Sequence, residues 1–147
     1  SIAIYIKCKR VLYLMGNYQS ISKINYEDLN ILINNNRKDY FLINTLNVYS
    51  QQCLIINTLQ YVDEESKLNK ALNENKSLMI IVYGMNYNDE SIYQKYIQLL
   101  KLGFDNVHIY PGGLFEWLLL QDIYGNENFK TTSQELDILK FKPISTN

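Results

Sequence analysis

The sequence predicts a single α/β domain in which a mostly parallel sheet is flanked by helices. Apolar segments with strand character alternate with amphipathic segments at short intervals through the middle of the chain. Residues 77–84, Ser-Leu-Met-Ile-Ile-Val-Tyr-Gly, are almost continuously apolar, as expected of a central parallel strand buried on both faces. The chain has 147 residues, of which 47% are hydrophobic, and this suits one domain with an ordinary core.

Residues 1–20 are expected to form an N-terminal extension. Two short apolar runs there are separated by Lys-Cys-Lys-Arg, a pattern too interrupted for the core of a signal peptide. Residues 15–20, Met-Gly-Asn-Tyr-Gln-Ser, match the N-myristoylation pattern, with Gly16 as the acylated residue. The motif functions only if translation starts at Met15, and a chance turn sequence is the alternative. Peripheral membrane contact through Gly16 is therefore a hypothesis, whereas no apolar run is long enough for a transmembrane segment.

The first half of the predicted domain contains two helices and two strands. Residues 24–35 are compatible with a short helix, in which Asn25 is the expected N-cap and Glu27 and Asp28 favour the first turn. Residues 40–44 and 53–57 are expected to be short buried strands. Residues 63–74 begin with acidic side chains and continue with apolar residues on one face, which predicts a second helix.

The second half repeats the alternation. After the strand at 77–84, residues 89–104 form an amphipathic pattern that Gly103 ends, and residues 106–110 predict a further strand. Gly112 and Gly113 then precede a helix that is expected to end near Gly125. The predicted domain spans residues 21–124. Residues 125–147 are expected to be a tail that packs on it through four apolar side chains: Leu136, Ile138, Leu139 and Phe141.

Composition excludes several classes of protein. The net charge of -1 gives no basic face for nucleic acid. Two cysteines, Cys8 and Cys53, make no disulfide framework, so an intracellular, cytoplasmic location is expected. One histidine and two distant cysteines provide no zinc spacing, and neither metal nor cofactor is expected. Abundant Asn, Ile, Lys and Tyr suggest an AT-rich genome; for a viral protein the location would be the host cytoplasm or the virion.

The stretch 80–120 resembles the rhodanese domain. An apolar strand enters a loop, a helix follows, and the pattern Leu-Gly-Phe, Asn-Val, Gly-Gly and Trp comes next. The residues in register are Leu102, Gly103, Phe104, Val107, Gly112, Gly113 and Trp117. Residues 24–44 also look like the opening helix and first core strand of that family, so the resemblance covers roughly residues 21–124. It implies a rhodanese-like fold, with Trp117 filling core volume.

The resemblance implies a persulfide-bearing cysteine at the position that Gly84 occupies. Glycine has no side chain, so it can neither attack a donor nor carry sulfur. The family's active-site loop corresponds here to Gly84, Met85, Asn86, Tyr87, Asn88 and Asp89. This loop contains no cation, and Asp89 and Glu90 would repel thiosulfate or phosphate. We therefore expect a catalytically inactive rhodanese-like domain that binds a protein partner or a small neutral ligand, or serves as a scaffold.

Two alternatives remain open. The first is a divergent sulfurtransferase in which Cys53, from the loop that resembles the family's second active-site segment, acts as the backup nucleophile. The second is a lipid-anchored structural or virion component. Because a reactive cysteine needs an exposed, electropositive setting and no cation is next to Cys53 in sequence, the inactive binding module is the preferred interpretation.

Overall fold

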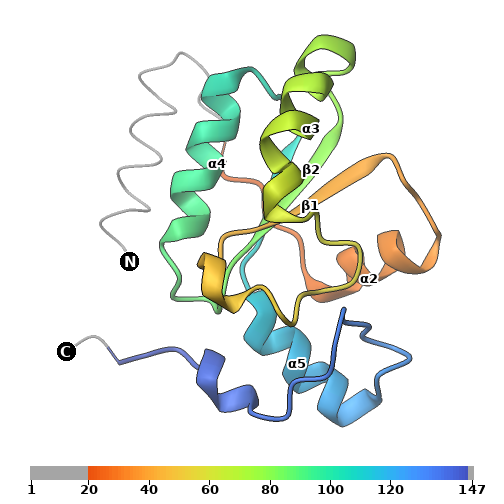
Figure 1. Cartoon of the computed structure of the whole chain (residues 1–147), viewed down its shortest axis with the longest axis vertical. Coiled ribbons are helices and arrows are strands. Elements are labelled where there is room, and N and C mark those ends of the chain that lie inside the picture. Colours follow the sequence, from red (N-terminus) through yellow and green to blue (C-terminus); the bar gives the residue numbers. More distant parts are fainter. Residues whose placement is uncertain (1–19, 146–147) are drawn as a thin grey trace.

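The computed structural model describes residues 20–145, which alternate between strands and helices (Figure 1). The elements are α2 (Tyr26–Asn34), β1 (Tyr40–Asn44), the 3-10 helix η1 (Val48–Ser50), α3 (Tyr61–Glu74), β2 (Met79–Tyr83), α4 (Ser91–Leu102), β3 (Val107–Tyr110), α5 (Gly113–Tyr124) and the 3-10 helix η2 (Ile138–Phe141). Strand β1 has the bounds that the sequence predicts, and every predicted helix is present. The prediction of an α/β fold is confirmed.

The three strands form a parallel sheet in the order β1-β2-β3. Ile81 in β2 faces Leu42 in β1 and His108 in β3, which fixes the register across the sheet. Isolated bridges extend both edges: Lys23 pairs with Ile109 beside β3, and Thr58 pairs with Leu42 beside β1, both in parallel. Since β2 is central, its carboxyl end and the loop after it lie between the ends of both neighbouring strands.

Helices cover both faces of the sheet. Successive residues of a strand point to opposite faces, so each strand contributes side chains to two cores. Ile80 and Val82 of β2 pack in one core with α3 and α4, whereas Ile81 and Tyr83 pack in the other core with α2 and α5. Figure 1 shows α3 and α4 together on one side and α5 with residues 138–145 on the other. Trp117 is fully buried in the second core, as the sequence predicts.

The first helix begins as expected. Asn25 accepts a hydrogen bond from the Asp28 backbone N–H at 2.9 Å, and Asp28 accepts one from the Asn25 N–H at 3.2 Å. This reciprocal pair is a capping box, which satisfies two donors that the first helical turn leaves unpaired.

Two sequence predictions are wrong. Residues 53–57 form no strand: residues 53–55 are buried and make one antiparallel bridge, between Ile55 and Thr131, and the chain then turns at residues 56–57. In the tail, Phe141 is buried and Ile138 packs against the core, as predicted, but the prediction is wrong for Leu136 and Leu139, which are 84% and 63% exposed. The reason is that η2 is a single short turn, which directs Phe141 into the core while Leu139 faces solvent. Within residues 20–145, no helix is both long and apolar enough to cross a bilayer. Gly16 and Cys8 lie outside the described residues.

Candidate functional site

The candidate site is the loop that follows β2. Gly84 comes directly after the strand, and its carbonyl accepts a hydrogen bond from the Leu114 N–H at 3.0 Å. The Met85 carbonyl accepts from the Phe115 N–H at 2.9 Å. These bonds attach the loop to the first turn of α5, and Gly113 permits this close approach. Its φ is +69°, and a Cβ there would lie 2.7 Å from the Gly84 carbonyl oxygen.

The carboxylate of Asp89 points back into the loop. Asp89 Oδ2 accepts a hydrogen bond from the Met85 N–H at 2.8 Å. Asp89 Oδ1 accepts from the Ser91 N–H at 3.0 Å and from Ser91 Oγ at 2.5 Å. The Ser91 N–H belongs to the first residue of α4, where a negative charge is favoured by the helix dipole. The loop thus holds an anion of its own, with N–H donors from both of its ends.

The Asp89 carboxylate has room beside Gly84 because glycine has no side chain. A Cβ built at Gly84 would lie 2.4 Å from Asp89 Oδ2 and 2.9 Å from Ile92 Cγ2. Any side chain at position 84 would therefore require the carboxylate to move. The sequence indicates Asp89 only as a charge that would repel anionic substrates; the structure adds that its carboxylate fills the space beside position 84, where the resemblance implies a cysteine.

The two asparagines of the loop bind the C-terminal segment, which we define as residues 138–145. Asn86 is buried, and its Nδ2 donates to the Phe141 carbonyl at 2.9 Å. Asn88 Nδ2 donates to the Ile144 carbonyl at 3.2 Å. The Asn88 N–H in turn donates to Asn86 Oδ1 at 2.9 Å, which fixes the amide of Asn86 in the orientation that points Nδ2 at the segment.

A shallow hollow of about 360 Å³ lies between the loop and this segment. Its lining residues are Met85, Asn86, Asn88, Asp89, Glu90, Lys142 and Ile144. Tyr87 of the loop is 69% exposed. Tyr83, at the end of β2, points into the core, where its hydroxyl lies 2.7 Å from Thr58 Oγ1, and burial raises its pKa above the ordinary value.

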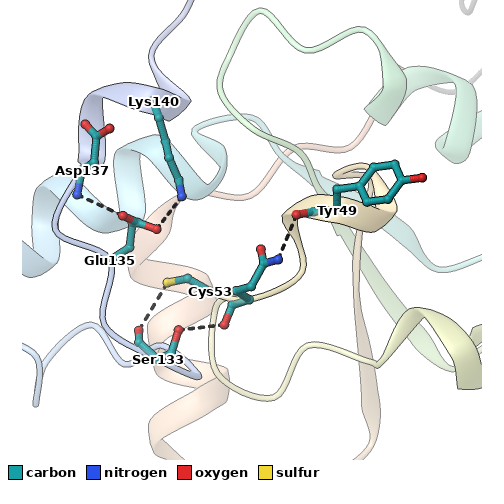
Figure 2. Close-up of polar contacts among 7 residues, drawn as sticks. Tyr49, Cys53, Ser133, Glu135, Asp137 and Lys140 are labelled. Atoms are coloured by element: carbon teal, nitrogen blue, oxygen red, sulfur yellow. Dashed lines mark hydrogen bonds and ion pairs between the residues drawn. The ribbon is translucent and has the colours of Figure 1, made fainter.

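Cys53 lies close to the loop, as the resemblance implies, because Cys53 and Met85 line one small hollow. Cys53 is 4% exposed, and its Sγ donates a hydrogen bond to the Ser133 carbonyl at 3.3 Å (Figure 2). Lys140 lines the same hollow and forms an ion pair with Glu135 at 2.6 Å. Lys140 is 87 positions from Cys53 along the chain, so no local sequence pattern could indicate that this cation lies near the thiol. The hydrogen bond to Glu135 raises the pKa of Lys140.

Two further positions have structural partners. Asn44, the last residue of β1, is buried and exchanges hydrogen bonds with the Gln51 amide at 2.8 and 3.0 Å. His108 Nδ1 lies 2.6 Å from Ser22 Oγ, and Nε2 lies 2.6 Å from Asn106 Oδ1. Burial lowers the pKa of His108. Among residues 20–145, no group of three or more His, Cys, Asp or Glu side chains is placed to hold a metal ion.

Comparison with known proteins agrees with this geometry. The Rhodanese-like domain family matches residues 42–120. No curated protein matches significantly. Among solved structures, the Alr3790 protein from Anabaena sp. is 20% identical with a TM-score of 0.56, over 80% of this chain and 97% of that one. The BH2092 protein from Bacillus halodurans is 17% identical with a TM-score of 0.57, over 71% and 74%.

A third similar structure is an enzyme, the thiosulfate sulfurtransferase from Pseudomonas aeruginosa. It is 13% identical with a TM-score of 0.57, over 94% of this chain and 26% of the enzyme. At such identities the likeness concerns the fold, and the family match rests on the 79 residues from 42 to 120, which are more than half of the chain. With its parallel sheet, the loop after β2 and the Gly112–Gly113 turn, the chain belongs to the rhodanese-like domain family.

Proposed function

We propose that this rhodanese-like domain does not transfer sulfur and acts as a binding module. The observation that carries the proposal is the pairing of Gly84 with Asp89. Sulfur transfer in this fold needs a thiolate that attacks the sulfane sulfur of the donor and keeps it as a persulfide, while the rest of the donor leaves. Position 84 has no side-chain atom for that bond, and the adjoining space holds a carboxylate.

The anion-stabilising groups of the loop are also engaged. A persulfide or thiosulfate anion is stabilised by N–H donors that point at it. Here the N–H groups of Met85 and Ser91 donate to Asp89, and those of Asn88 and Asp89 donate to oxygens of Asn86. An incoming anion would have to displace a bound carboxylate and approach its negative charge. These contacts favour a neutral or cationic ligand.

The experiment is a thiosulfate-to-cyanide sulfur-transfer assay combined with intact mass spectrometry after incubation with thiosulfate. We expect thiocyanate at the level of the buffer blank and no added sulfur on Cys8 or Cys53. The Cys53→Ser variant is the matched control, and it should behave as the wild-type chain does. Turnover by the wild-type chain that Cys53→Ser abolishes would overturn the proposal.

Sulfur transfer through Cys53 is the second candidate function, because one observation favours it. Cys53 shares a hollow with Met85 of the loop and with the cation of Lys140. Three observations weigh against it: the thiol is 4% exposed, it donates to the Ser133 carbonyl, and Glu135 neutralises Lys140. A nucleophilic thiolate needs exposure and an available positive charge, so the binding module remains the better supported proposal.

Lipid anchoring of a structural or virion component is a separate proposal, and it rests on the Met15-Gly16 pattern alone. The intact mass of the natively expressed protein tests it. A chain that begins at Gly16 and carries the mass of a myristoyl group would support the anchor, and an unlipidated chain that begins upstream of Met15 would exclude it.

A further inference from the structure

The C-terminal segment lies against the loop through its main chain. Asn86 and Asn88 donate to the carbonyls of Phe141 and Ile144, two backbone acceptors three residues apart. After η2 the backbone becomes extended at Lys142, with φ −61° and ψ 149°. Side-chain amides that bind the carbonyls of an extended segment recognise a peptide backbone, and flanking pockets then select side chains.

The segment is attached at few points. Phe141 is 4% exposed and packs in the core with Trp117 and Phe129, whereas Leu139 and Ile144 are 63% and 78% exposed. Residues 139–145 thus contact the rest of the chain through the buried ring of Phe141, the packing of η2 on α5, the two hydrogen bonds from Asn86 and Asn88, and the ion pair of Lys140 with Glu135. An attachment of this size can be exchanged without unfolding the sheet.

The chemistry of the hollow indicates what it accepts. Lys142 and Ile144 line it together with Asp89 and Glu90, so one basic residue of the segment shares the hollow with two acidic residues of the loop. The order along the segment is aromatic, basic, proline and aliphatic, at Phe141, Lys142, Pro143 and Ile144.

We propose that the loop at 84–90 forms one wall of a groove for an extended peptide, and that the chain's own residues 141–144 occupy this groove. A partner segment with the same order, aromatic, basic, proline and aliphatic, competes for it. This inference rests on the proposed binding function and names its ligand class. It does not depend on catalysis, because sulfur transfer and peptide binding are measured separately.

The test uses the full-length chain with Phe141→Ala, which removes the anchor from the resident segment. A fluorescent peptide with the sequence of residues 139–145, Leu-Lys-Phe-Lys-Pro-Ile-Ser, is titrated into the wild-type and variant chains. We expect binding to Phe141→Ala to be at least about tenfold tighter than to the wild type, and the peptide to raise the melting temperature of the variant alone. A peptide with alanine in place of its phenylalanine should not bind.

Further variants examine the backbone contacts. Asn86→Asp keeps the oxygen that accepts from the Asn88 N–H but loses the donor to Phe141, so it should weaken peptide binding to Phe141→Ala at least about tenfold. Asn30→Asp is the matched control. Its Nδ2 also donates to a backbone carbonyl, that of Asn128 at 2.9 Å, but away from the loop, and binding should not change.

Three results would overturn the proposal. The first is a folded Phe141→Ala chain that binds no peptide, and the second is binding that Asn86→Asp leaves unchanged. The third is a wild-type dimer that Phe141→Ala dissociates, which would assign the groove to a second copy. If Phe141→Ala fails to fold, amide hydrogen exchange provides the test. Asn86→Asp in the otherwise wild-type chain should speed amide exchange at Lys142 and leave exchange in β2 unchanged. The same exchange rate at Lys142 in the wild-type and Asn86→Asp chains would reject the groove.

Discussion

The carboxylate of Asp89 fills the space that a side chain at Gly84 would need: a Cβ at position 84 would lie 2.4 Å from Asp89 Oδ2. The same carboxylate oxygen accepts the Met85 N–H at 2.8 Å, so it is held in place by the loop that Gly84 begins. Glycine at position 84 therefore has a structural role, because it leaves room for the Asp89 carboxylate. The N–H donors of the loop bind this carboxylate, so they are not directed at an empty site for an anionic substrate.

Gly84→Ala should destabilise the fold by about 1–3 kcal/mol, because the added methyl group overpacks the site. In an Asp89→Ala background the cost should be smaller, since part of the collision is then absent, although contact with Ile92 Cγ2 remains. Chemical denaturation of the wild-type chain, both single variants and the double variant gives the coupling energy. Additivity of the two single effects would contradict the steric pairing.

Gly84→Cys alone should not give sulfur-transfer activity. The new thiol would lie against Asp89, whose negative charge disfavours a thiolate, and a displaced Asp89 would leave the loop without its internal acceptor. Thiosulfate-to-cyanide turnover by this variant should remain at the blank. The Gly84→Cys/Asp89→Ser variant serves for comparison, because it removes both the collision and the charge. Robust turnover by Gly84→Cys alone would show that Asp89 does not block the site.

Gly113→Ala should be more destabilising than Gly103→Ala. Both glycines have positive φ, +69° and +114°, which costs a residue with a side chain about 1–2 kcal/mol. At Gly113 a Cβ would also lie 2.7 Å from the Gly84 carbonyl oxygen, whereas at Gly103 the nearest atom, Leu72 Cδ2, lies 3.9 Å away. The difference in free energy of unfolding between the two variants measures the close approach of α5 to the loop. Equal costs would argue against that contact.

His108 should titrate below its ordinary pKa, because burial disfavours the imidazolium. A group with a depressed pKa in the folded state contributes stability above its unfolded pKa of about 6.5, and this is lost as the pH falls through the folded value. The chain has one histidine, so a single imidazole signal can be followed by NMR. A midpoint at or above about 6.5 would contradict the prediction, and His108→Gln should flatten the stability profile between about pH 7 and 5.

Cys53 should react slowly with thiol reagents in the folded chain. The thiol is 4% exposed and donates to the Ser133 carbonyl, so alkylation requires local opening. Iodoacetamide labelling, followed by peptide mass spectrometry that separates Cys53 from Cys8, should be roughly a hundredfold slower in buffer than in denaturant. Labelling of Cys53 at the denatured rate would show an accessible thiol and would favour the second candidate function.

The sequence alone determined the elements whose signals are local. The continuous apolar run at 77–84 predicted β2, because a central parallel strand is buried on both faces. Asn25 predicted the start of α2, because an N-cap and its acceptor lie within one turn. Gly84 itself, with the pattern through Trp117, was enough to predict the rhodanese-like fold and the absence of a nucleophile at that position.

Local apolar character did not suffice at 53–57. A strand requires a partner along its whole length, and this segment bridges Thr131 at one residue, Ile55, before the chain turns at residues 56–57. The tertiary structure alone decided three further relationships: Asp89 turns inward onto Met85, Lys140 reaches the hollow of Cys53, and Asn86 binds the carbonyl of Phe141. The last two join residues far apart in sequence, and the first depends on a side-chain direction. No periodicity or composition encodes such contacts, because they arise only when packing brings the segments together.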